Sequence, residues 1–347
     1  MRALTISAHG GLDRLEYRED LPEPTLSGPT DVRIRVTAGA LNHLDIFLIG
    51  GLPGVNITPP WILGADATGV VESVGEDVTT VAVGDTVIVN PGTSCGHCEY
   101  CLSDDQPLCL RYRILGEHIP GTFAELLVVP ARSVYRVPST VPTAQRAAFG
   151  LATLTAWRMV VTRARVQAGD DVLIWGIGGG VALQAMQLCI QLGARVWVTS
   201  GSDAKLDRAR QMGAHETLNH HSQDVVREIR ARTGKRGMDV VLDNVGEATW
   251  KRSLGSLGRR GRLVTCGGTS GAIVETDVRR MFWNQWTLMG STMGSETEFA
   301  AIVTELAAGR LLPIVDSVFP LSDGRAAFER LQSGEQFGKV VLQISEG

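Results

Sequence analysis

Hydrophobic and polar residues follow two different patterns along the chain, and the pattern changes near residue 140. Before that point the apolar residues come in short alternating runs, which is the period of half-buried strands. Residues 31–36 (DVRIRV) alternate in this way, and further short strands are expected at 69–74 and 86–89, between glycines and prolines. Many short strands joined by glycine turns predict a β-rich, barrel-like sheet domain.

After residue 140 the pattern predicts alternating strands and helices. Strands are expected at 171–175 (DVLIW) and 194–199, each followed by a helix, at 181–192 and 205–212. Three later apolar runs, at 240–243, 262–265 and 287–290, continue the series of strands. This order predicts an α/β fold with a doubly wound parallel sheet, which the chain leaves near residue 295.

Length and charge narrow the class of protein. A chain of 347 residues has room for two domains, and 44% hydrophobic with 20% charged residues is typical of a globular enzyme. The net charge of -4 and the lack of a basic run argue against nucleic acid as a partner. No apolar stretch reaches about 18 residues and no signal-peptide pattern opens the chain, so we expect no membrane partner and a cytoplasmic location.

Four of the six cysteines lie in one short run, with two, two and seven residues between them: Cys95, Cys98, Cys101 and Cys109. Thiolates at this spacing are typical of a closed tetrahedral zinc site. Two disulfides are the alternative, but no secretory signal precedes them, and the other cysteines, Cys189 and Cys266, lie in apolar stretches. Because four thiolates leave no open position for water, we expect one structural Zn²⁺ per chain.

A glycine loop at 176–182 (GIGGGVA) follows a predicted strand and opens a predicted helix. A dinucleotide-binding loop needs this context, because glycine lets the backbone approach the pyrophosphate at the helix N-terminus. The alternative is a tight turn without a ligand. The loop residues predicted to contact the cofactor are Gly176, Gly179, Gly180 and Val181.

The end of the second strand of this sheet bears on the choice of cofactor. An acid there would bind the ribose of NAD, but the strand ends in Thr-Ser-Gly at 199–201. Ser200 and Lys205, with Ser202 and Arg208, are placed to surround a phosphate. NADP(H) is therefore favoured over NAD(H), although the two basic residues also suit a solvated helix face and Asp203 remains a candidate for the ribose.

Several motifs together resemble the medium-chain dehydrogenase/reductase superfamily, which includes zinc alcohol dehydrogenases and quinone oxidoreductases. They are the cysteine run, the glycine loop, the stretch 64–75 (GADATGVVESVG), the turn 83–85 (VGD) and the ending 337–341 (FGKVV). The resemblance implies a GroES-like catalytic domain from residues 1–150 and 295–347, with a zinc lobe near 92–112. It also implies a Rossmann dinucleotide-binding domain at 151–294, and a homodimer or homotetramer joined through an edge near 283–291.

The same resemblance shows that ligands of a catalytic zinc are missing. Where zinc alcohol dehydrogenases have Cys-x-x-Asp, residues 42–45 read Asn-His-Leu-Asp, and where they have Gly-His-Glu, residues 64–66 read Gly-Ala-Asp. A third ligand would fall near Leu151, which cannot bind metal. The carboxylates and the histidine that remain in these two elements leave only weak binding of a second metal open.

The Asn-x-x-Asp element instead resembles that of zinc-independent quinone and enoyl reductases. Such enzymes pass hydride from the nicotinamide to a quinone or to the β-carbon of an α,β-unsaturated carbonyl. The resemblance makes Asn42 the candidate polar group near the nicotinamide and the substrate oxygen, with Asp45 orienting it or a neighbouring turn. The alternative for Asn42 is a loop residue that bonds local backbone.

The remaining predicted cofactor contacts also come from matching motifs: Thr155 at the nicotinamide carboxamide, Asn244 beneath the cofactor, Gly267 and Gly268 at the nicotinamide side, and His43 and Lys339 at the phosphates. Thr155 is equally suited to bonding its own helix, and Lys339 to a surface position. Two other functions stay open: an alcohol dehydrogenase that interconverts alcohols with aldehydes or ketones, and a non-catalytic NADPH-binding protein.

Overall fold

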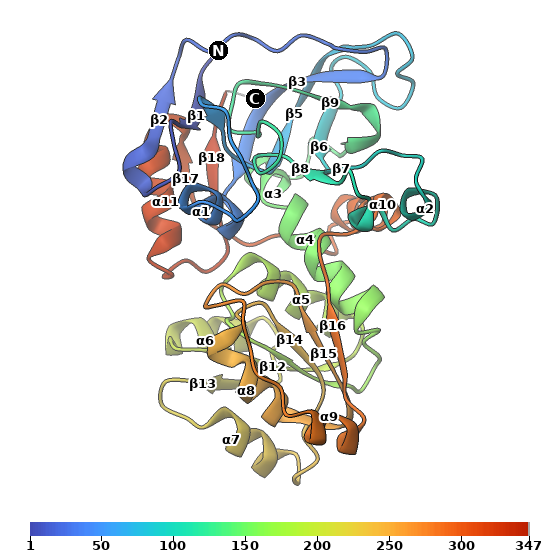
Figure 1. The fold of residues 1–347 in the computed structure, drawn as a ribbon, viewed down its shortest axis with the longest axis vertical. Helices are drawn as coiled ribbons and strands as arrows, with labels where there is room; N and C mark the ends of the chain where they lie inside the picture. The colour runs from blue at the N-terminus through green and yellow to red at the C-terminus, as the bar shows by residue number, and fades with distance from the viewer. Residues whose placement is uncertain (346–347) are drawn as a thin grey trace. The chain divides into compact units, whose positions relative to one another are not determined.

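The computed structural model describes residues 1–345 and divides them into two compact units (Figure 1). The discontinuous unit is formed by Met1–Leu154 together with the chain from Met293 onward, and the continuous unit is Thr155–Thr292. Each unit has a hydrophobic core of its own. Among the described residues, none of the helices combines the length and the apolar character needed to cross a bilayer.

Six parallel strands form the sheet of the continuous unit, in the order β13-β12-β11-β14-β15-β16. The direction of winding reverses between β11 and β14, which is where doubly wound sheets bind their ligands. The predicted parallel sheet is therefore confirmed. Its strands are β11 (Asp171–Ile174), β12 (Arg195–Ser200), β13 (Glu216–Asn219), β14 (Met238–Asp243), β15 (Leu257–Thr265) and β16 (Thr287–Gly290). Its helices are α5 (Gly180–Gln191), α6 (Asp203–Gln211), α7 (Val225–Arg232), α8 (Glu247–Ser256) and α9 (Val278–Asn284).

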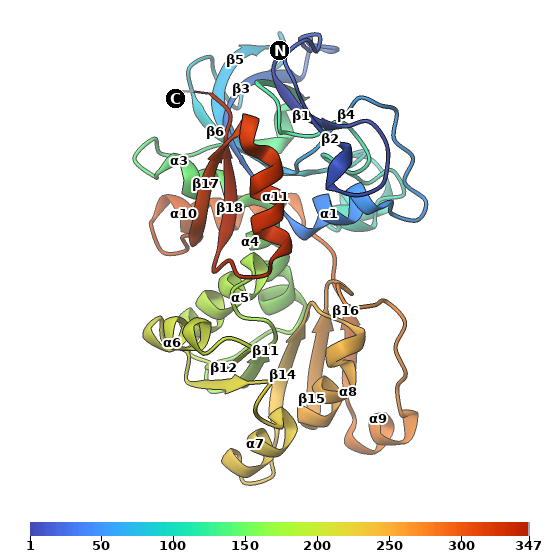
Figure 2. The ribbon, with the colours of Figure 1, turned by 90° about the vertical axis from the view of Figure 1, so that its left-hand side faces the viewer.

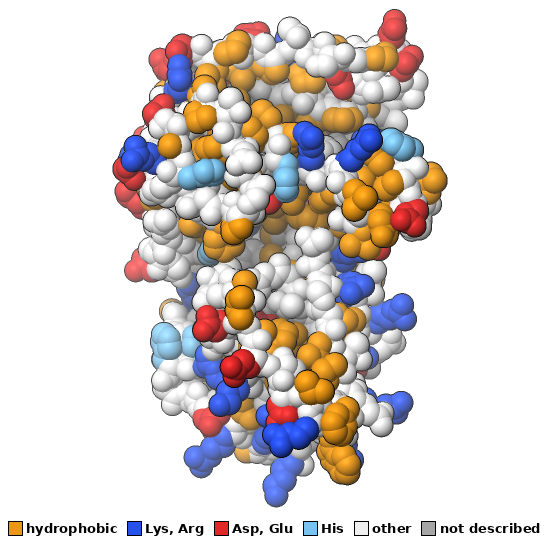
Figure 3. All heavy atoms as spheres, in the orientation of Figure 1, with side chains coloured by type: hydrophobic (Ala, Val, Ile, Leu, Met, Phe, Trp, Pro, Cys, Tyr) orange, Lys and Arg blue, Asp and Glu red, His pale blue; other side chains and the backbone are white. Residues whose placement is uncertain are grey.

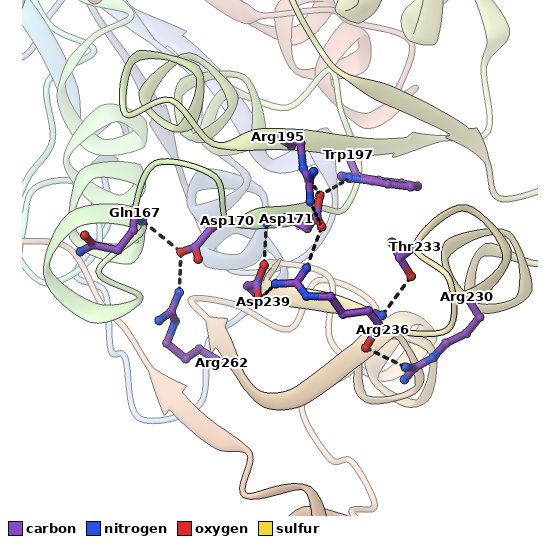
Figure 4. Close-up of polar contacts among 11 residues, drawn as sticks. Gln167, Asp170, Asp171, Arg195, Trp197, Arg230, Thr233, Arg236, Asp239 and Arg262 are labelled. Atoms are coloured by element: carbon purple, nitrogen blue, oxygen red, sulfur yellow. Dashed lines mark hydrogen bonds and ion pairs between the residues drawn. The ribbon is translucent and has the colours of Figure 1, made fainter.

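A network of charged side chains ties the amino ends of these strands together (Figure 4). The buried carboxylate of Asp171 accepts hydrogen bonds from Arg195 Nε at 2.8 Å, from Arg236 at 2.9 Å and from the indole of Trp197 at 3.1 Å. Asp239 accepts from the Asp171 backbone at 2.8 Å. The network lies at the edge of the sheet opposite the glycine loop, so it stabilises the sheet without entering a cofactor site.

The main sheet of the discontinuous unit joins strands from both ends of the chain. Its order is β10-β6-β5-β3-β18-β17, with β9 also paired to β3, so β18 lies between β3 and β17. Figure 2 shows α11 running alongside β17 and β18, which it contacts. The strands of this sheet are β3 (Asp31–Ala40), β5 (Asp66–Val74), β6 (Thr86–Val89), β9 (Leu126–Pro130), β10 (Val134–Arg136), β17 (Val315–Pro320) and β18 (Lys339–Gln343).

Short strands and helices complete the discontinuous unit. The strands outside the main sheet are β1 (Ala3–Ile6), β2 (Leu15–Arg18), β4 (Trp61–Ile62), β7 (Gly92–Thr93) and β8 (Arg113–Ile114). The helices are α1 (His43–Gly50), α2 (Glu99–Leu102), α3 (Thr143–Ala147), α10 (Glu296–Ala307) and α11 (Gly324–Gln332), with α4 (Gly150–Trp157) beginning in this unit and ending in the next. Helix α4 continues into a π-helical segment, Arg158–Arg163.

Strand β3 is longer than the predicted 31–36. Its last residues do not alternate, because Thr37, Ala38, Gly39 and Ala40 are all buried. Ala38 and Ala40 pack against Ala147 at the end of α3 while the strand pairs with β5 and β18 on its two sides. A strand covered on both faces loses the period-2 pattern, so the sequence underestimates its length.

Candidate active site

The glycine loop lies at the carboxyl end of β11, on the side of the reversal in strand order. Gly176 and Gly178 have φ values of +69° and +121°, where a side chain would be strained. Ile177 donates its backbone N–H to Thr199 O at 2.8 Å, which fixes the loop against β12. Helix α5 then begins at Gly180, and its first backbone N–H groups have no acceptor within the helix. The loop therefore offers the concave backbone and helix N-terminus that hold a pyrophosphate.

Three other predicted cofactor residues follow neighbouring strands at the same edge. Asn244 comes directly after β14, and Gly267 and Gly268 follow β15 in an exposed turn. Asp243 shapes the first of these turns, because its buried carboxylate accepts from the backbone N–H of Val245 at 2.9 Å and from the Ser253 hydroxyl at 2.6 Å. The structure brings these residues to one edge of one sheet, as parallel strands require.

The end of β12 carries the residues predicted to select the cofactor. Ser200 Oγ accepts from the backbone N–H of Ser202 at 3.1 Å, and Ser202 Oγ accepts from that of Lys205 at 3.4 Å, which caps α6. Asp203 is exposed in the first turn of α6, and its carboxylate accepts from Asn219 Nδ2 at 2.6 Å. The carboxyl end of β12 is therefore followed by two serine hydroxyls and the half-exposed Lys205 side chain, while the carboxylate of Asp203 is hydrogen-bonded to Asn219.

The four cysteines of the run come together around α2. Their sulfur atoms all lie within 4.8 Å of one another, with Cys95 Sγ at 3.8 Å and Cys98 Sγ at 3.5 Å from Cys101 Sγ. Four sulfurs bound to one zinc at about 2.3 Å are separated by about 3.8 Å. Cys109 Sγ also accepts from the backbone N–H groups of Cys95 and Arg111, which fix the position of this sulfur. The donor set and its spacing therefore fit a tetrahedral zinc ion.

Asn42 and Asp45 lie at the beginning of α1. The Asp45 carboxylate accepts from the backbone N–H of Asn42 at 2.7 Å, which closes the first turn of the helix. Burial raises the pKa of Asp45 to about 7, although the backbone of Asn42 and the charge of Lys339 both act to lower it. His43 is the first residue of α1, where desolvation of its ring, followed by the charge of Lys339, lowers its pKa.

A buried ion pair stands where the resemblance placed the ligands of a catalytic metal. Lys339 Nζ donates to Asp66 Oδ2 at 3.0 Å and to Asn42 Oδ1 at 2.5 Å. Asn42 Nδ2 donates to the same Asp66 oxygen at 2.9 Å. Asp66 is fully buried, and Lys339 and Asn42 are only 5% and 7% exposed. We call these three side chains the lysine triad.

The second oxygen of Asp66 is also occupied. Asp66 Oδ1 accepts from the backbone N–H of Leu151 at 2.6 Å. This approach requires glycine at the preceding position, since a Cβ on Gly150 would lie 2.6 Å from that oxygen. The site does not fit a second zinc, because both Asp66 oxygens are engaged and an ammonium lies beside them. Among residues 1–345, the four cysteines are the only group of three or more His, Cys, Asp and Glu side chains spaced as metal ligands.

Two further predicted cofactor residues lie on elements outside the parallel sheet. Thr155 lies buried on α4. Lys339 was expected at the cofactor phosphate, but the structure places its ammonium within the triad, and the phosphate contact stays a prediction. Sequence reasoning gave Asp66 only a weak metal role and did not pair it with Lys339. The two are 273 residues apart, so no local pattern signals their contact.

Comparison with known proteins identifies the family of both units. The alcohol dehydrogenase GroES-like domain matches residues 28–139, and the zinc-binding dehydrogenase family matches residues 180–308. A quinone oxidoreductase from Homo sapiens is 28% identical over 99% of this chain and 98% of its own length. The crystal structure of an NAD-dependent alcohol dehydrogenase is 41% identical, with a TM-score of 0.95 over 99% of this chain and 100% of that one.

A further structure agrees with this assignment. A cobalt- and zinc-bound thermostable alcohol dehydrogenase from Pyrobaculum aerophilum is 36% identical, with a TM-score of 0.88 over 99% of both chains. These relatives confirm the fold class predicted from the sequence, a Rossmann-type parallel sheet with a GroES-like domain. The glycine loop, the β-rich unit and the 41% identical relative together show that this chain belongs to the medium-chain dehydrogenase/reductase superfamily and is an NAD(P)-dependent oxidoreductase.

Proposed function

We propose that this oxidoreductase reduces quinones or carbon–carbon double bonds conjugated to a carbonyl, without a catalytic metal. The observation that carries the proposal is the lysine triad, which fills the second metal position with an amide, a carboxylate and an ammonium. A zinc-dependent alcohol dehydrogenase needs an open metal site with soft or imidazole ligands to polarise its alcohol. A conjugated acceptor needs only a nearby hydrogen-bond donor for the oxygen that gains charge.

The two units have separate roles in this proposal. The carboxyl edge of the parallel sheet holds the dinucleotide, through the glycine loop and the turns at Asn244 and Gly267. When bound, the reduced nicotinamide supplies the hydride. The discontinuous unit supplies the groups that meet the substrate, and Asn42 and Asp45 are the residues assigned there from the sequence. We propose domain limits of 1–150 with 295–347, and 151–294.

NADP(H) is the proposed cofactor. Support comes from the tip of β12, where the half-exposed Lys205 follows two serine hydroxyls. Asp203 is held by Asn219, so it is turned to a neighbouring side chain. The 41% identical structure is described as NAD-dependent, which makes NAD(H) the alternative to be tested.

The four-cysteine cluster is proposed to hold one structural zinc. Cys95, Cys98, Cys101 and Cys109 would be its ligands, and all four positions would be protein thiolates. The ion would hold together the loop around α2, a helix of only four residues. None of the six cysteines, all within the described residues, forms a disulfide, which agrees with the proposed cytoplasmic location.

A homodimer is proposed through β16 and α9. Strand β16 is the last strand of the parallel sheet, so one of its edges is open. Figure 3 shows hydrophobic side chains gathered over α9, and Val278, Phe282 and Trp283 are each more than 60% exposed. An open strand edge beside an apolar surface favours pairing with a second copy of the chain, although a tetramer stays open.

A second candidate is an NAD-dependent alcohol dehydrogenase, favoured by the 41% identical relative, which is an enzyme of that kind. Elemental analysis of freshly purified protein separates the two. One zinc per subunit, lost in Cys109→Ser and kept in Cys189→Ala, supports the proposed function, and two zincs support the alcohol dehydrogenase. Steady-state assays then compare 1,4-benzoquinone and 2-cyclohexen-1-one with primary and secondary alcohols. Oxidation of alcohols alone would overturn the proposal.

Asn42→Ala tests the assignment made from the sequence. The substitution removes an acceptor from Lys339 and a donor from Asp66, so it should lower turnover much more than it lowers NADPH affinity. Unchanged turnover would remove Asn42 from the mechanism.

A further inference from the structure

Within residues 1–345, one hydrogen of the Lys339 ammonium has no acceptor. An ammonium has three N–H donors. In residues 1–345 the structure gives it two acceptors, Asp66 Oδ2 and Asn42 Oδ1. A lysine that is 5% exposed pays a large desolvation cost unless its donors are satisfied. The third donor is therefore available to a ligand that enters the site.

Asn42 lacks this capacity. Its two amide hydrogens are directed at Asp66 Oδ2, at 2.9 Å, and at the carbonyl of Ala40, at 3.3 Å. Its oxygen accepts from Lys339. An amide with both hydrogens engaged cannot donate to a substrate without breaking one of these bonds. The sequence made Asn42 the candidate polar group near the substrate oxygen, and its engaged hydrogens leave Lys339 as the donor for that oxygen.

We propose that Lys339 is the electrophilic residue of the reaction, and that its third N–H donates to the substrate oxygen on which negative charge develops. The inference rests on the proposed function, since it concerns a quinone or conjugated carbonyl. Asp66 and Asn42 are positioning residues that hold the ammonium from two sides.

The chemical step balances without a metal. Hydride adds to the β-carbon, the π electrons of the double bond move towards the carbonyl, and the oxygen becomes an enolate. The Lys339 N–H stabilises this oxygen by a charge-assisted hydrogen bond, and a proton from water then adds to the α-carbon. The cofactor is oxidised by two electrons and the substrate is reduced by two. Lys339 ends the step in the protonation state in which it began.

The surrounding charges support this role. Asp66 is the carboxylate in contact with the ammonium, and Asp45 and His43 are the other titratable groups near it. Asp66 lies in direct contact with the Lys339 ammonium, at 3.0 Å, so the two opposite charges face one another in the interior. Neither oxygen of Asp66 points at open solvent, because Leu151 and Lys339 engage them. The remaining N–H is then the polar group of the triad left for a substrate.

The test compares Lys339→Met with wild-type enzyme and with the control Lys251→Met, which removes an exposed lysine on α8. Single-turnover hydride transfer is followed by NADPH absorbance with 1,4-benzoquinone and with 2-cyclohexen-1-one. Removing one preorganised donor to an oxyanion slows the step by about 10²–10³-fold. We expect that loss in Lys339→Met, an NADPH Kd within about threefold of wild type, and no effect in the control.

A second measurement of the role of Lys339 does not depend on turnover. The phenolate of 4-nitrophenol is titrated by its absorbance in the enzyme–NADP⁺ complex, and the proposal predicts a lower apparent pKa in wild type than in Lys339→Met. If no quinone or enone is reduced but this difference is present, the proposed function fails and the role of Lys339 stands. Should Lys339→Met not fold, Lys339→Gln keeps a donor to Asp66 without the charge, and it is expected to slow hydride transfer at least tenfold.

Two outcomes overturn the proposal. One is an unchanged rate of hydride transfer in the neutral variants. The other is a Kd for NADPH raised tenfold or more with an unchanged single-turnover rate at saturating NADPH. That second result would place Lys339 at the cofactor phosphate.

Discussion

Removing the Asp66 carboxylate should open the discontinuous unit locally. Asp66→Ala leaves the Lys339 ammonium with one acceptor, Asn42 Oδ1, and takes the acceptor from the Leu151 backbone N–H. Asp66 is fully buried and Lys339 nearly so, so water cannot replace the lost partner without entering the core. Breaking a buried ion pair by deleting one partner costs about 3–5 kcal/mol.

A matched double variant tests whether the stranded Lys339 charge causes the loss of stability. Adding Lys339→Met to Asp66→Ala removes the stranded charge and leaves an apolar side chain in its place. Replacing both members of a buried pair by apolar groups is often nearly neutral. The double variant should therefore be more stable than Asp66→Ala alone, by at least about 2 kcal/mol, even though it carries one more substitution.

Hydrogen exchange measures the effect where it occurs. Peptides from β5 and β18 are followed by mass spectrometry, because local opening is resolved there without assuming that two units unfold together. A cost of 3–5 kcal/mol corresponds to exchange faster by roughly a hundred- to several-thousand-fold. The control is Glu305→Ala, which breaks the surface pair with Arg310 and should cost less than about 1 kcal/mol. A double variant as labile as Asp66→Ala would refute the argument.

Three further predictions address other parts of the chain. Burial raises the folded-state pKa of Asp45 to about 7, above its unfolded value, so the free energy of unfolding should fall as the pH rises from 4 to 7, by up to about 1.4 kcal/mol per pH unit. Urea denaturation of Asp45→Asn should show a weaker dependence on pH than wild type, and parallel profiles would contradict this. Lys205→Glu should shift the ratio of kcat/KM values from NADPH towards NADH, and an unchanged ratio would refute the phosphate assignment at the tip of β12. Asp171→Ala takes the acceptor from Arg195 and Arg236, and it should lower the free energy of unfolding by about 3 kcal/mol. The Kd for NADPH should stay within twofold of wild type, and a larger Kd would show that the network at the amino ends of the strands affects cofactor binding.

Much of the fold follows from the sequence because local signals agree with tertiary packing. The strand at 287–290 is β16 as predicted, and the helix at 181–192 differs from α5 by one residue at each end. Edge strand β13 was missed, because Glu216–Asn219 carries few apolar residues and lies at the margin of the sheet. Patterns identify strands that are buried more readily than strands that only complete an edge.

The candidate site also has parts that the sequence predicts and parts that it does not. The metal ligands and the glycine loop are contiguous in sequence, so their spacing could be interpreted directly. The lysine triad combines side chains from β18, β5 and the residue before α1, and only the folded sheet brings them together. Sequence reasoning recognised that Asn42 was unusual at its position but could not identify its partner. A contact across nearly the whole chain has no periodic signal.

The place of β18 in the middle of its sheet also bears on how the protein is made. Synthesis proceeds from the amino terminus, and domains generally fold as units while the chain emerges. The strands of the parallel sheet are complete by Gly290, whereas residues 38–40 of β3, beyond the part paired with β9, have no partner on the side away from β5 until residues 339–343 have left the ribosome. A stalled nascent chain that ends before β18 would thus have an assembled dinucleotide-binding sheet in one unit and an exposed edge at the end of β3 in the other. The same missing strand carries Lys339, so the last step in building the sheet is also the step that delivers the charge of the triad.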